Sequence, residues 1–170
     1  TIQQMEATRV RIRALEPEDL DELYAIENDT SIWQLGVTNV PYSKYLLHNY
    51  IANSNGDIYH DGQVRMMVET KQGNVIGIVD IIDFSPAHKR AEIGIVIKQE
   101  HRHKGYATEA LRLIKDYALN ILHLHQLYAV IACNNEEATM LFQHNGFDVQ
   151  NVLKEWLYDG KTYYDAQIMQ

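Results

Sequence analysis

The strongest constraint on the fold is a change of hydrophobic period between residues 90 and 122. Residues 90–97 are predicted to form a strand, with Gly94 in its interior. From Tyr106 to Leu122, apolar side chains recur at intervals of three or four residues, which is the spacing of one face of an α-helix. A strand that leads through a short loop into a long amphipathic helix is typical of sheets covered by helices. The segment therefore predicts an α/β protein.

The rest of the chain supplies further strands and helices around this unit. A strand is predicted over 10–15, followed by helices that begin after Glu16 and, with Ser43 as the cap, after Pro41. The strand predicted over 74–84 has few polar positions on either face, so helices are expected both above and below it. The other predicted elements are strands over 65–69, 126–133, 147–158 and 161–169, and a helix that Asn134 or Asn135 caps and Gly146 stops. We therefore expect a single-domain mixed sheet with helices on both faces.

The charge balance of the chain excludes some classes of partner. Lys and Arg number 15 against 23 Asp and Glu, which gives a net charge of −8. This charge opposes attraction to a phosphate backbone and favours cationic small molecules, so no nucleic acid partner is expected. No stretch contains the roughly 20 apolar residues of a membrane span, and residues 1–6 lack the features of a signal peptide. We expect a soluble, cytoplasmic protein with no membrane partner.

Two kinds of side chain that often carry chemistry are expected to have other roles here. His123 and His125 could present two imidazoles on one side of a strand, but no third ligand has a suitable spacing, so no metal site is expected. Cys133 is the single cysteine, which excludes an internal disulfide and a four-cysteine zinc site. Because it follows an apolar strand, we expect it to be a small core residue rather than a nucleophile.

The loop that leads into the long helix is basic, although the chain as a whole is acidic. Arg102 and Lys104 bring full positive charges, and Gly105 and Ala107 leave the backbone bare enough for a ligand to approach. The first amides of a helix are unpaired, and the helix dipole adds about half a positive charge there. The loop is therefore predicted to bind a pyrophosphate, with a solvated basic turn as the alternative. The patterns of P-loops and of dinucleotide-binding loops are absent, so the ligand is expected to be another phosphate-bearing molecule.

Residues 102–107, Arg-His-Lys-Gly-Tyr-Ala, match the Gln/Arg-x-x-Gly-x-Gly/Ala signature of the Gcn5-related N-acetyltransferase (GNAT) superfamily. The chain resembles this superfamily over essentially its whole length, most closely the branch of spermidine acetyltransferases and of enzymes that acetylate the amino termini of ribosomal proteins. The matching stretches include 90–93, 105–110, 135–138 and the hairpin through 159–161. The resemblance implies a V-shaped splay between the strands at 93–97 and 126–133. It also implies an enzyme that transfers an acetyl group from acetyl-coenzyme A, by direct attack, to a primary amine of a small cationic molecule or a peptide amino terminus.

The resemblance also assigns residues to the cofactor. The backbone of Ile95 and Ile97 is expected to hydrogen-bond the pantetheine arm, and Asn135 to bind the arm near its amides, with a plain helix cap as the alternative for Asn135. The loop is expected to surround the pyrophosphate of acetyl-coenzyme A, with no metal involved. The cofactor-binding residues implied in this way are Ile95, Val96, Ile97, Arg102, His103, Lys104, Gly105, Tyr106, Ala107, Thr108, Asn135 and Phe142.

The resemblance further divides the single domain, residues 1–170, into three parts. Residues 1–64 are expected to supply mainly acceptor-side helices and a loop, residues 65–146 the cofactor-binding core, and residues 147–170 a terminal hairpin. The hairpin leaves a strand edge that a second copy of the chain could cover. We therefore expect a homodimer or a higher homo-oligomer.

The acceptor amine needs a base. An alkylammonium with a pKa near 10.4 must lose a proton before it attacks a thioester, which costs about 4.6 kcal/mol at pH 7. Glu92 lies on the strand that borders the splay and is the candidate base, acting through water. A structural role beside Arg90 is the alternative for Glu92. Glu69, Asp80 and Asp83, on neighbouring strands, compete for the catalytic role.

The acceptor itself is expected near the irregular stretch between the first two helices. Glu27 and Asp29, at the mouth of this stretch, are candidates for binding the positive charge of the substrate. Trp33 is a candidate for lining the substrate pocket, with a plug of the core as the alternative. Spermidine acetyltransferases carry an acidic loop here, whereas residues 38–42 contain no carboxylate. A polyamine, a peptide amino terminus and an aminoglycoside-like amine therefore all stay open as acceptors.

One residue departs from the pattern of the superfamily. Many members have a tyrosine in the last helix, in Asn-x-x-Ala-x-x-Leu-Tyr, which is proposed to protonate the leaving thiolate; this chain has Phe142 there. Since a thiol has a pKa near 8.5, departure as the thiolate costs only about 2 kcal/mol at pH 7. We therefore expect reduced rather than absent turnover. The alternative is a non-catalytic acyl-coenzyme A-binding or regulatory module that has lost its general acid.

Overall fold

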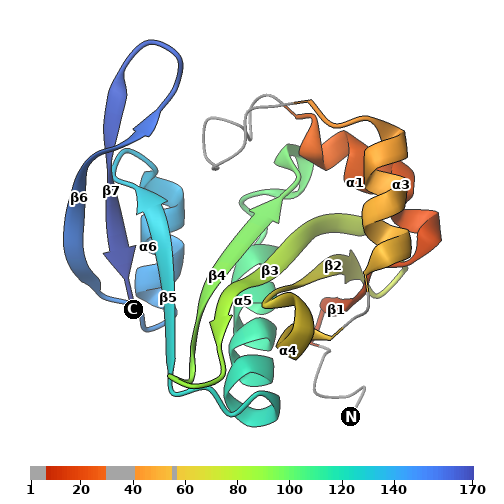
Figure 1. Ribbon diagram of the computed structural model, residues 1–170, viewed down its shortest axis with the longest axis horizontal. Coiled ribbons are helices and arrows are strands. Elements are labelled where there is room, and N and C mark those ends of the chain that lie inside the picture. Colours follow the sequence, from red (N-terminus) through yellow and green to blue (C-terminus); the bar gives the residue numbers. More distant parts are fainter. Residues whose placement is uncertain (1–6, 30–40, 55–56) are drawn as a thin grey trace.

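The computed structural model describes residues 7–29, 41–54 and 57–170 and is shown in Figure 1. The elements of the amino-terminal half are β1 (Val10–Ala14), the 3-10 turn η2 (Pro17–Asp19), α1 (Leu20–Glu27), α3 (Lys44–Asn53), α4 (Ile58–Asp61), β2 (Val64–Thr70) and β3 (Val75–Ser85). They are followed by β4 (Arg90–Ile97), η3 (Gln99–His101), α5 (Tyr106–Asp116), the π-helical turn η4 (Tyr117–Ile121), β5 (Gln126–Ala132), α6 (Glu136–His144), β6 (Val149–Tyr158) and β7 (Tyr163–Met169).

The strands form one mixed sheet in the order β1-β2-β3-β4-β5-β7-β6. Neighbours are antiparallel except β4 and β5, which are parallel and pair only from Arg90 opposite Gln126 to Glu92 opposite Tyr128. Beyond Glu92 the two strands diverge, and β5 continues beside β7 instead (Figure 1). The predicted mixed sheet with a V-shaped splay between two central strands is therefore confirmed.

Helices cover both faces of the sheet because adjacent residues of a strand point to opposite sides. Met66 and Val68 of β2 belong to the larger core cluster, which also contains the apolar face of α5. Met67, between them, belongs to a second cluster with Leu23 of α1 and Leu47 of α3. The apolar sequence of the central strands thus reflects burial on two sides, as predicted.

The ends of the helices follow the predicted caps. The Ser43 hydroxyl accepts a hydrogen bond from the Leu46 amide at the start of α3. The predicted helix over 106–122 has a regular part that ends at Asp116 and then widens into η4. The short helix α4 was not predicted, because its four residues are too few to show a hydrophobic period. The Asp57 carboxylate caps it by accepting from the Tyr59 amide.

The expectation that Cys133 is a core residue is wrong. The side chain is exposed, and Cys133 follows directly after the last residue of β5, Ala132. Within residues 7–29, 41–54 and 57–170, no group of three or more His, Cys, Asp or Glu side chains is placed to hold a metal ion. None of the helices that the structure describes is long and apolar enough to cross a membrane.

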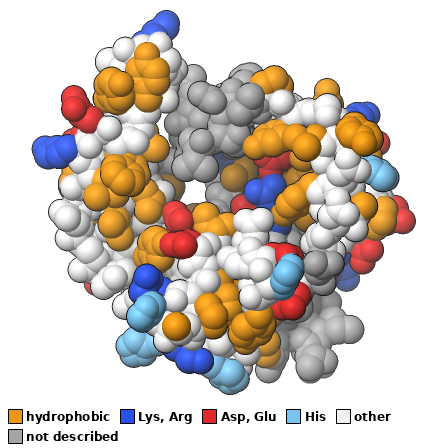
Figure 2. Space-filling view, viewed as in Figure 1, with side chains coloured by type: hydrophobic (Ala, Val, Ile, Leu, Met, Phe, Trp, Pro, Cys, Tyr) orange, Lys and Arg blue, Asp and Glu red, His pale blue; other side chains and the backbone are white. Residues whose placement is uncertain are grey.

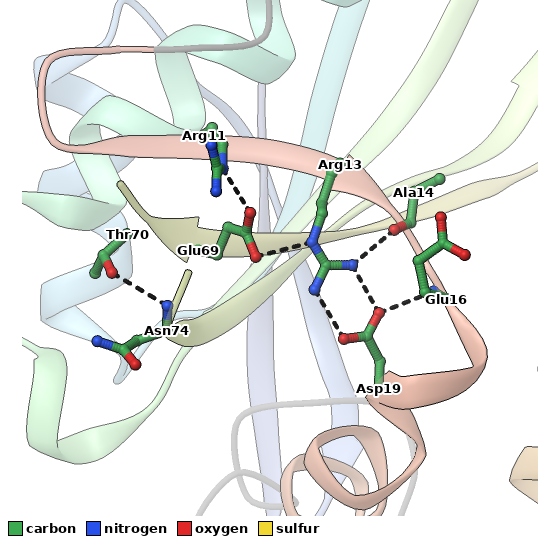
Figure 3. A network of polar contacts seen from close by, with 8 residues as sticks. All are labelled: Arg11, Arg13, Ala14, Glu16, Asp19, Glu69, Thr70 and Asn74. Atoms are coloured by element: carbon green, nitrogen blue, oxygen red, sulfur yellow. Dashed lines mark hydrogen bonds and ion pairs between the residues drawn. The ribbon is translucent and has the colours of Figure 1, made fainter. Parts of the chain in front are cut away.

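A buried network of ion pairs ties β1 to β2 and to η2 (Figure 3). The Arg13 guanidinium donates two hydrogen bonds to the Asp19 carboxylate, at 2.7 and 2.8 Å, and one to Glu69 at 2.8 Å. Glu69 also accepts from Arg11, at 2.5 Å. Both carboxylates are buried. Glu69 thus has a structural role at the β1–β2 edge and is not among the described residues that line the splay.

We expect Arg13→Met to lower the free energy of unfolding by about 2 kcal/mol at pH 7, because it removes the cation that pairs with the buried Asp19 carboxylate and leaves Glu69 with Arg11 alone. Burial raises the pKa of Asp19 and of Glu69. Hydrogen bonds outweigh this effect: Arg13 donates to both carboxylates, the Glu16 amide donates to Asp19, and Arg11 donates to Glu69. Both pKa values therefore lie below the ordinary ones. The pairs therefore stabilise the fold above the unfolded-state pKa values, near 4, and stop doing so as the pH falls through the lower folded-state values.

Urea unfolding of both proteins at pH 7 and at pH 3 tests this. The difference between them is expected to shrink at pH 3, and a difference that stays constant would contradict an electrostatic origin.

Candidate active site

A cavity of about 620 Å³ lies where β4 and β5 separate, a size typical of small-molecule sites. Its walls are the two diverging strands, the loop that follows β4, the first turn of α5 and one face of α6, and it extends to the end of α1. Figure 2 shows the hollow between the two halves of the molecule, with acidic and basic side chains at its edge. The cavity therefore joins the cofactor side and the acceptor side that the sequence predicts.

The edge of β4 that borders the cavity has backbone groups directed into it. Alternate residues of an antiparallel strand direct their backbone groups to the same neighbour. The Lys98 amide donates to the Ile76 carbonyl of β3, at 2.8 Å, in a register that places Ile97 opposite Gly77. The backbone groups of Ile95 and Ile97 therefore face the splay rather than β3. An extended ligand placed there would meet a strand edge, as the sequence predicts.

The basic loop and the start of α5 form one end of the cavity. Gly105 is the residue before the helix and has a φ of 81°, a left-handed conformation that glycine adopts without strain. The amides of the first turn of α5 follow it and have no partner within the helix. The predicted loop residues that line the cavity are Arg102, His103, Gly105, Tyr106, Ala107 and Thr108.

Lys104 differs from the other predicted loop residues. It is exposed and is not among the described residues that line the cavity. Its backbone carbonyl accepts a hydrogen bond from the Arg9 guanidinium, at 2.7 Å. Lys104 therefore contributes to the loop through its backbone, and its charged side chain is exposed to solvent.

The opposite wall of the cavity is formed by α6. The Asn135 side chain caps this helix by accepting from the Ala138 amide, at 3.1 Å, and it also lines the cavity. The cap and the predicted place at the cofactor are therefore compatible. Phe142 is buried, lines the cavity and packs edge-on against Phe147, with ring centres 5.0 Å apart. The position that carries a hydroxyl in many relatives is thus filled by an apolar ring.

Glu92 lies at the apex of the splay, in the last residue pair that joins β4 to β5. Its side chain lines the cavity, and the nearby Val130 backbone favours its ionised form. Burial and the nearby Asp83 carboxylate raise the pKa of Glu92. Asp83 in turn accepts a hydrogen bond from the Tyr128 hydroxyl, at 2.6 Å. A carboxylate with a raised pKa in a cleft is the kind of group that can accept a proton from a substrate.

The acceptor end of the cavity contains an ion-pair cluster that was not predicted as a unit. Arg65 of β2 donates to the Asp80 carboxylate of β3, at 2.8 Å, and also pairs with Glu27 at the end of α1. The guanidinium faces the ring of Tyr50, with its carbon 5.9 Å from the ring centre. Glu27, Arg65 and Asp80 all line the cavity. Asp80 is thus engaged with a cation, so it is a weaker candidate for the base than Glu92.

The other two predicted acceptor residues lie elsewhere. Asp29 follows the carboxyl end of α1 and is not among the described residues that line the cavity. Trp33 lies outside the described residues. Of the predicted acceptor residues, the structure therefore brings Glu27 to the cavity.

Comparison with known proteins gives a consistent result. Residues 9–148 match the model of the family described as acetyltransferase (GNAT) domain. Spermidine N(1)-acetyltransferase of Escherichia coli K12 is 30% identical over 160 residues, which cover 94% of this chain and 84% of that protein. The crystal structure of spermidine N-acetyltransferase from Vibrio cholerae in complex with CoA and spermine superposes with a TM-score of 0.86 at 31% identity, covering 94% of this chain and 93% of that one. A dodecameric structure of the Vibrio cholerae enzyme gives a TM-score of 0.79 at 30% identity, covering 94% and 91%.

Proposed function

Because the chain belongs to the GNAT acetyltransferases, we propose that it transfers the acetyl group of acetyl-coenzyme A (acetyl-CoA) to a primary amine of a polyamine. The observation that carries the proposal is that one cavity joins the loop at the start of α5 to the carboxylates of Glu27, Asp80 and Glu92. An anionic end suits a cationic acceptor, and the end with free amides suits a diphosphate. The spermidine acetyltransferases of Escherichia coli and Vibrio cholerae support the choice of a polyamine.

The residues that line the V-shaped splay between β4 and β5, called the V below, hold the acetyl donor. The amides and guanidinium of residues 102–108 bind the diphosphate, and the backbone of Ile95 and Ile97 pairs with the pantetheine arm as with an added strand. Val96 contributes to the same wall, and Asn135 offers its side-chain NH₂ from the other side. Acetyl-CoA supplies an activated acyl group, so the chain needs to position that group and to manage protons.

The Arg65 cluster holds the acceptor. Two carboxylates, Glu27 and Asp80, surround one guanidinium, which leaves a net negative charge at this end of the cavity. A second ammonium of a polyamine would be attracted there while its terminal amine reaches the apex of the V. These groups come from α1, β2 and β3, so the acceptor side draws on both the 1–64 and the 65–146 parts of the domain.

Glu92 accepts the proton that the ammonium must lose. The proton passes through water to the carboxylate, so Glu92 assists the deprotonation that costs about 4.6 kcal/mol at pH 7. The neutral nitrogen then attacks the thioester carbon directly, and the carbon–nitrogen bond forms as the carbon–sulfur bond breaks. The nitrogen gives its second proton to water, which leaves the neutral amide. The sulfur leaves as the thiolate and takes a proton from solvent, since Phe142 has none to give.

Release of the CoA thiol from acetyl-CoA tests the proposed function. The acceptors are spermidine, spermine, a peptide with a free amino terminus and an aminoglycoside. We expect thiol release to depend on the polyamines. Release with the peptide alone would overturn the choice of acceptor, and tight CoA binding without amine-dependent release would favour the non-catalytic alternative.

We expect Phe142→Tyr to raise kcat by about threefold to tenfold, within the limit of about 30-fold that corresponds to the 2 kcal/mol cost of thiolate departure. The new hydroxyl would stand at the cavity wall, where it can give the leaving sulfur its proton. Phe147→Tyr is the matched control, because it adds the same hydroxyl to the ring packed against Phe142, at a position outside the described cavity wall. Steady-state rates at saturating polyamine measure the effect. An unchanged or lower rate for Phe142→Tyr would count against this account.

We also propose that the chain assembles into homo-oligomers. The edge strand β6 leaves apolar side chains exposed, and Tyr158 and Tyr163 stack on each other beside them, with ring centres 4.8 Å apart. The exposed apolar residues of this strand are Val149, Val152, Trp156 and Tyr158. A bare strand edge with apolar side chains favours association with another chain. Light scattering coupled to gel filtration measures the number of copies.

A further inference from the structure

Arg9, just before β1, is attached to the loop at the start of α5, almost 100 residues away in the sequence. Its backbone amide and its Nε donate to the Glu109 carboxylate, at 2.9 and 2.5 Å, and its Nη2 pairs with the same group. Its Nη1 donates to the Lys104 carbonyl, at 2.7 Å. The guanidinium also lies over the Tyr106 ring, 4.8 Å from the ring centre. One side chain thus contacts three successive parts of the loop and helix.

The contact with Glu109 changes the charge of the loop. Glu109 lies in the first turn of α5, where a carboxylate interacts favourably with the helix dipole but opposes the approach of an anion. Its side chain is largely covered, so solvent screens its charge only in part. The full positive charge of Arg9 sits against this carboxylate. The first turn of α5 therefore presents unpaired amides with the charge of Glu109 cancelled.

The contact with Lys104 fixes the shape of the loop. It holds the carbonyl that directly precedes Gly105, the residue whose φ of 81° turns the chain into α5. A Cβ atom on Gly105 would stand 2.8 Å from Nη2 of Arg9, so the bare side of this glycine is the side that Arg9 covers. Nε, Nη1 and Nη2 each have a partner in the loop or in α5, so the contacts of Arg9 in this structure hold the loop.

We propose that Arg9 is a positioning residue for acetyl-CoA: it cancels the charge of Glu109 and holds the Lys104–Gly105 turn, so that the amides of α5 can receive the diphosphate. The proposal rests on the proposed function, because it concerns the same loop. Its action is confined to the diphosphate end of the donor. The thioester end, at the apex of the V, is unaffected.

The test compares the CoA affinity of four proteins by calorimetry: wild type, Arg9→Ala, Glu109→Ala and the double variant. Arg9→Ala leaves the Glu109 carboxylate uncompensated, and we expect it to weaken CoA binding about tenfold, in the range of lost charge-assisted contacts. The double variant no longer carries that carboxylate, and we expect it to recover to within about threefold of wild type. Equal weakening in Arg9→Ala and in the double variant would overturn the role of charge cancellation.

A second readout separates positioning of the diphosphate from general damage. Acetyl-pantetheine has the thioester and the arm but lacks the diphosphate, so its kcat/KM is expected to be the same in wild type and Arg9→Ala. An equal loss for both donors would overturn the proposal. Arg11→Ala is the control, because it removes another guanidinium from the same region, one that pairs with Glu69 instead of the loop. If wild type binds no CoA, the proposed function fails; if wild type binds and Arg9→Ala binds equally well, this inference alone fails.

Discussion

Replacement of Glu92 by glutamine is expected to lower kcat/KM for the polyamine by about 100- to 1,000-fold at pH 7, the usual contribution of a general base. Glutamine keeps the size of the side chain and removes only its charge, so the apex of the V is expected to keep its shape. The CoA affinity is therefore expected to stay within about twofold of wild type, since the diphosphate end is untouched. Glu155→Gln is the matched control, because it removes the same charge from an exposed position on β6.

The pH dependence of the same variant identifies the role of Glu92. In wild type, kcat/KM falls as the pH falls through the pKa of Glu92, and because burial and Asp83 raise this pKa, the fall begins at a higher pH than for an ordinary glutamate. Glu92→Gln lacks this acidic limb. Its deficit is expected to shrink as the pH approaches the pKa of the amine, near 10.4, where the acceptor needs no base. A deficit that is constant with pH would assign Glu92 a structural role.

The stability of Glu92→Gln is a further check. A carboxyl whose folded-state pKa is raised contributes stability below its unfolded-state pKa and loses that contribution as the pH rises through the folded-state value. Above the folded-state pKa, Glu92 therefore gives the fold no stability. We expect the variant to unfold at the same temperature as wild type or higher, so that lost activity cannot be attributed to unfolding.

Gly105→Val is expected to weaken CoA binding by 100-fold or more, on the order of the cost of a β-branched residue at positive φ together with the lost loop contacts. Valine at a φ of 81° forces the turn to rearrange, and its side chain displaces the Arg9 guanidinium that lies on this side of the loop. The amides of α5 then lose their orientation toward the diphosphate. Calorimetric titration with CoA measures the effect.

Gly62→Val provides the matched control for backbone strain. Gly62 has a φ of 70°, similar to that of Gly105, and no atom lies within 4 Å of the Cβ that it would gain. It ends α4 and is not among the described residues that line the cavity. The control is expected to lose a comparable amount of stability and to keep its CoA affinity. If both variants bind CoA equally, the loop at Gly105 does not hold the diphosphate.

Much of the fold could be predicted from the sequence because it is encoded in local patterns. The helical period from Tyr106 and the glycine before it predict the loop and α5, and Asp159-Gly160 predicts the last hairpin. The splay could not be derived from periodicity, because it depends on where β4 and β5 stop pairing. It was predicted from the resemblance of residues 102–107 to the GNAT superfamily.

The parts of the site that escaped prediction depend on contacts between distant segments. Arg65 and Asp80 lie opposite each other in the β2–β3 register. Counting residues outward from the predicted hairpin turn does not pair them, because the irregularity between Val68 and Glu69 shifts the register by one residue. Glu27 joins this ion pair because the end of α1 lies close to β2, and no local sequence pattern indicates that approach. Arg9 and Glu109 are likewise brought together by the packing of α5 against β1.

The position of β7 has a consequence for how the protein forms during synthesis. This strand leaves the ribosome after β1 to β6, yet it lies between β5 and β6 and pairs with the edge of β5 that faces away from β4. The part of the sheet that contains β5 therefore cannot be completed until residue 169 has been synthesised, whereas β1 to β4 and α5 can assemble earlier. A nascent chain would therefore form the β4 edge and the loop before α5 first, and complete the opposite wall of the cavity last.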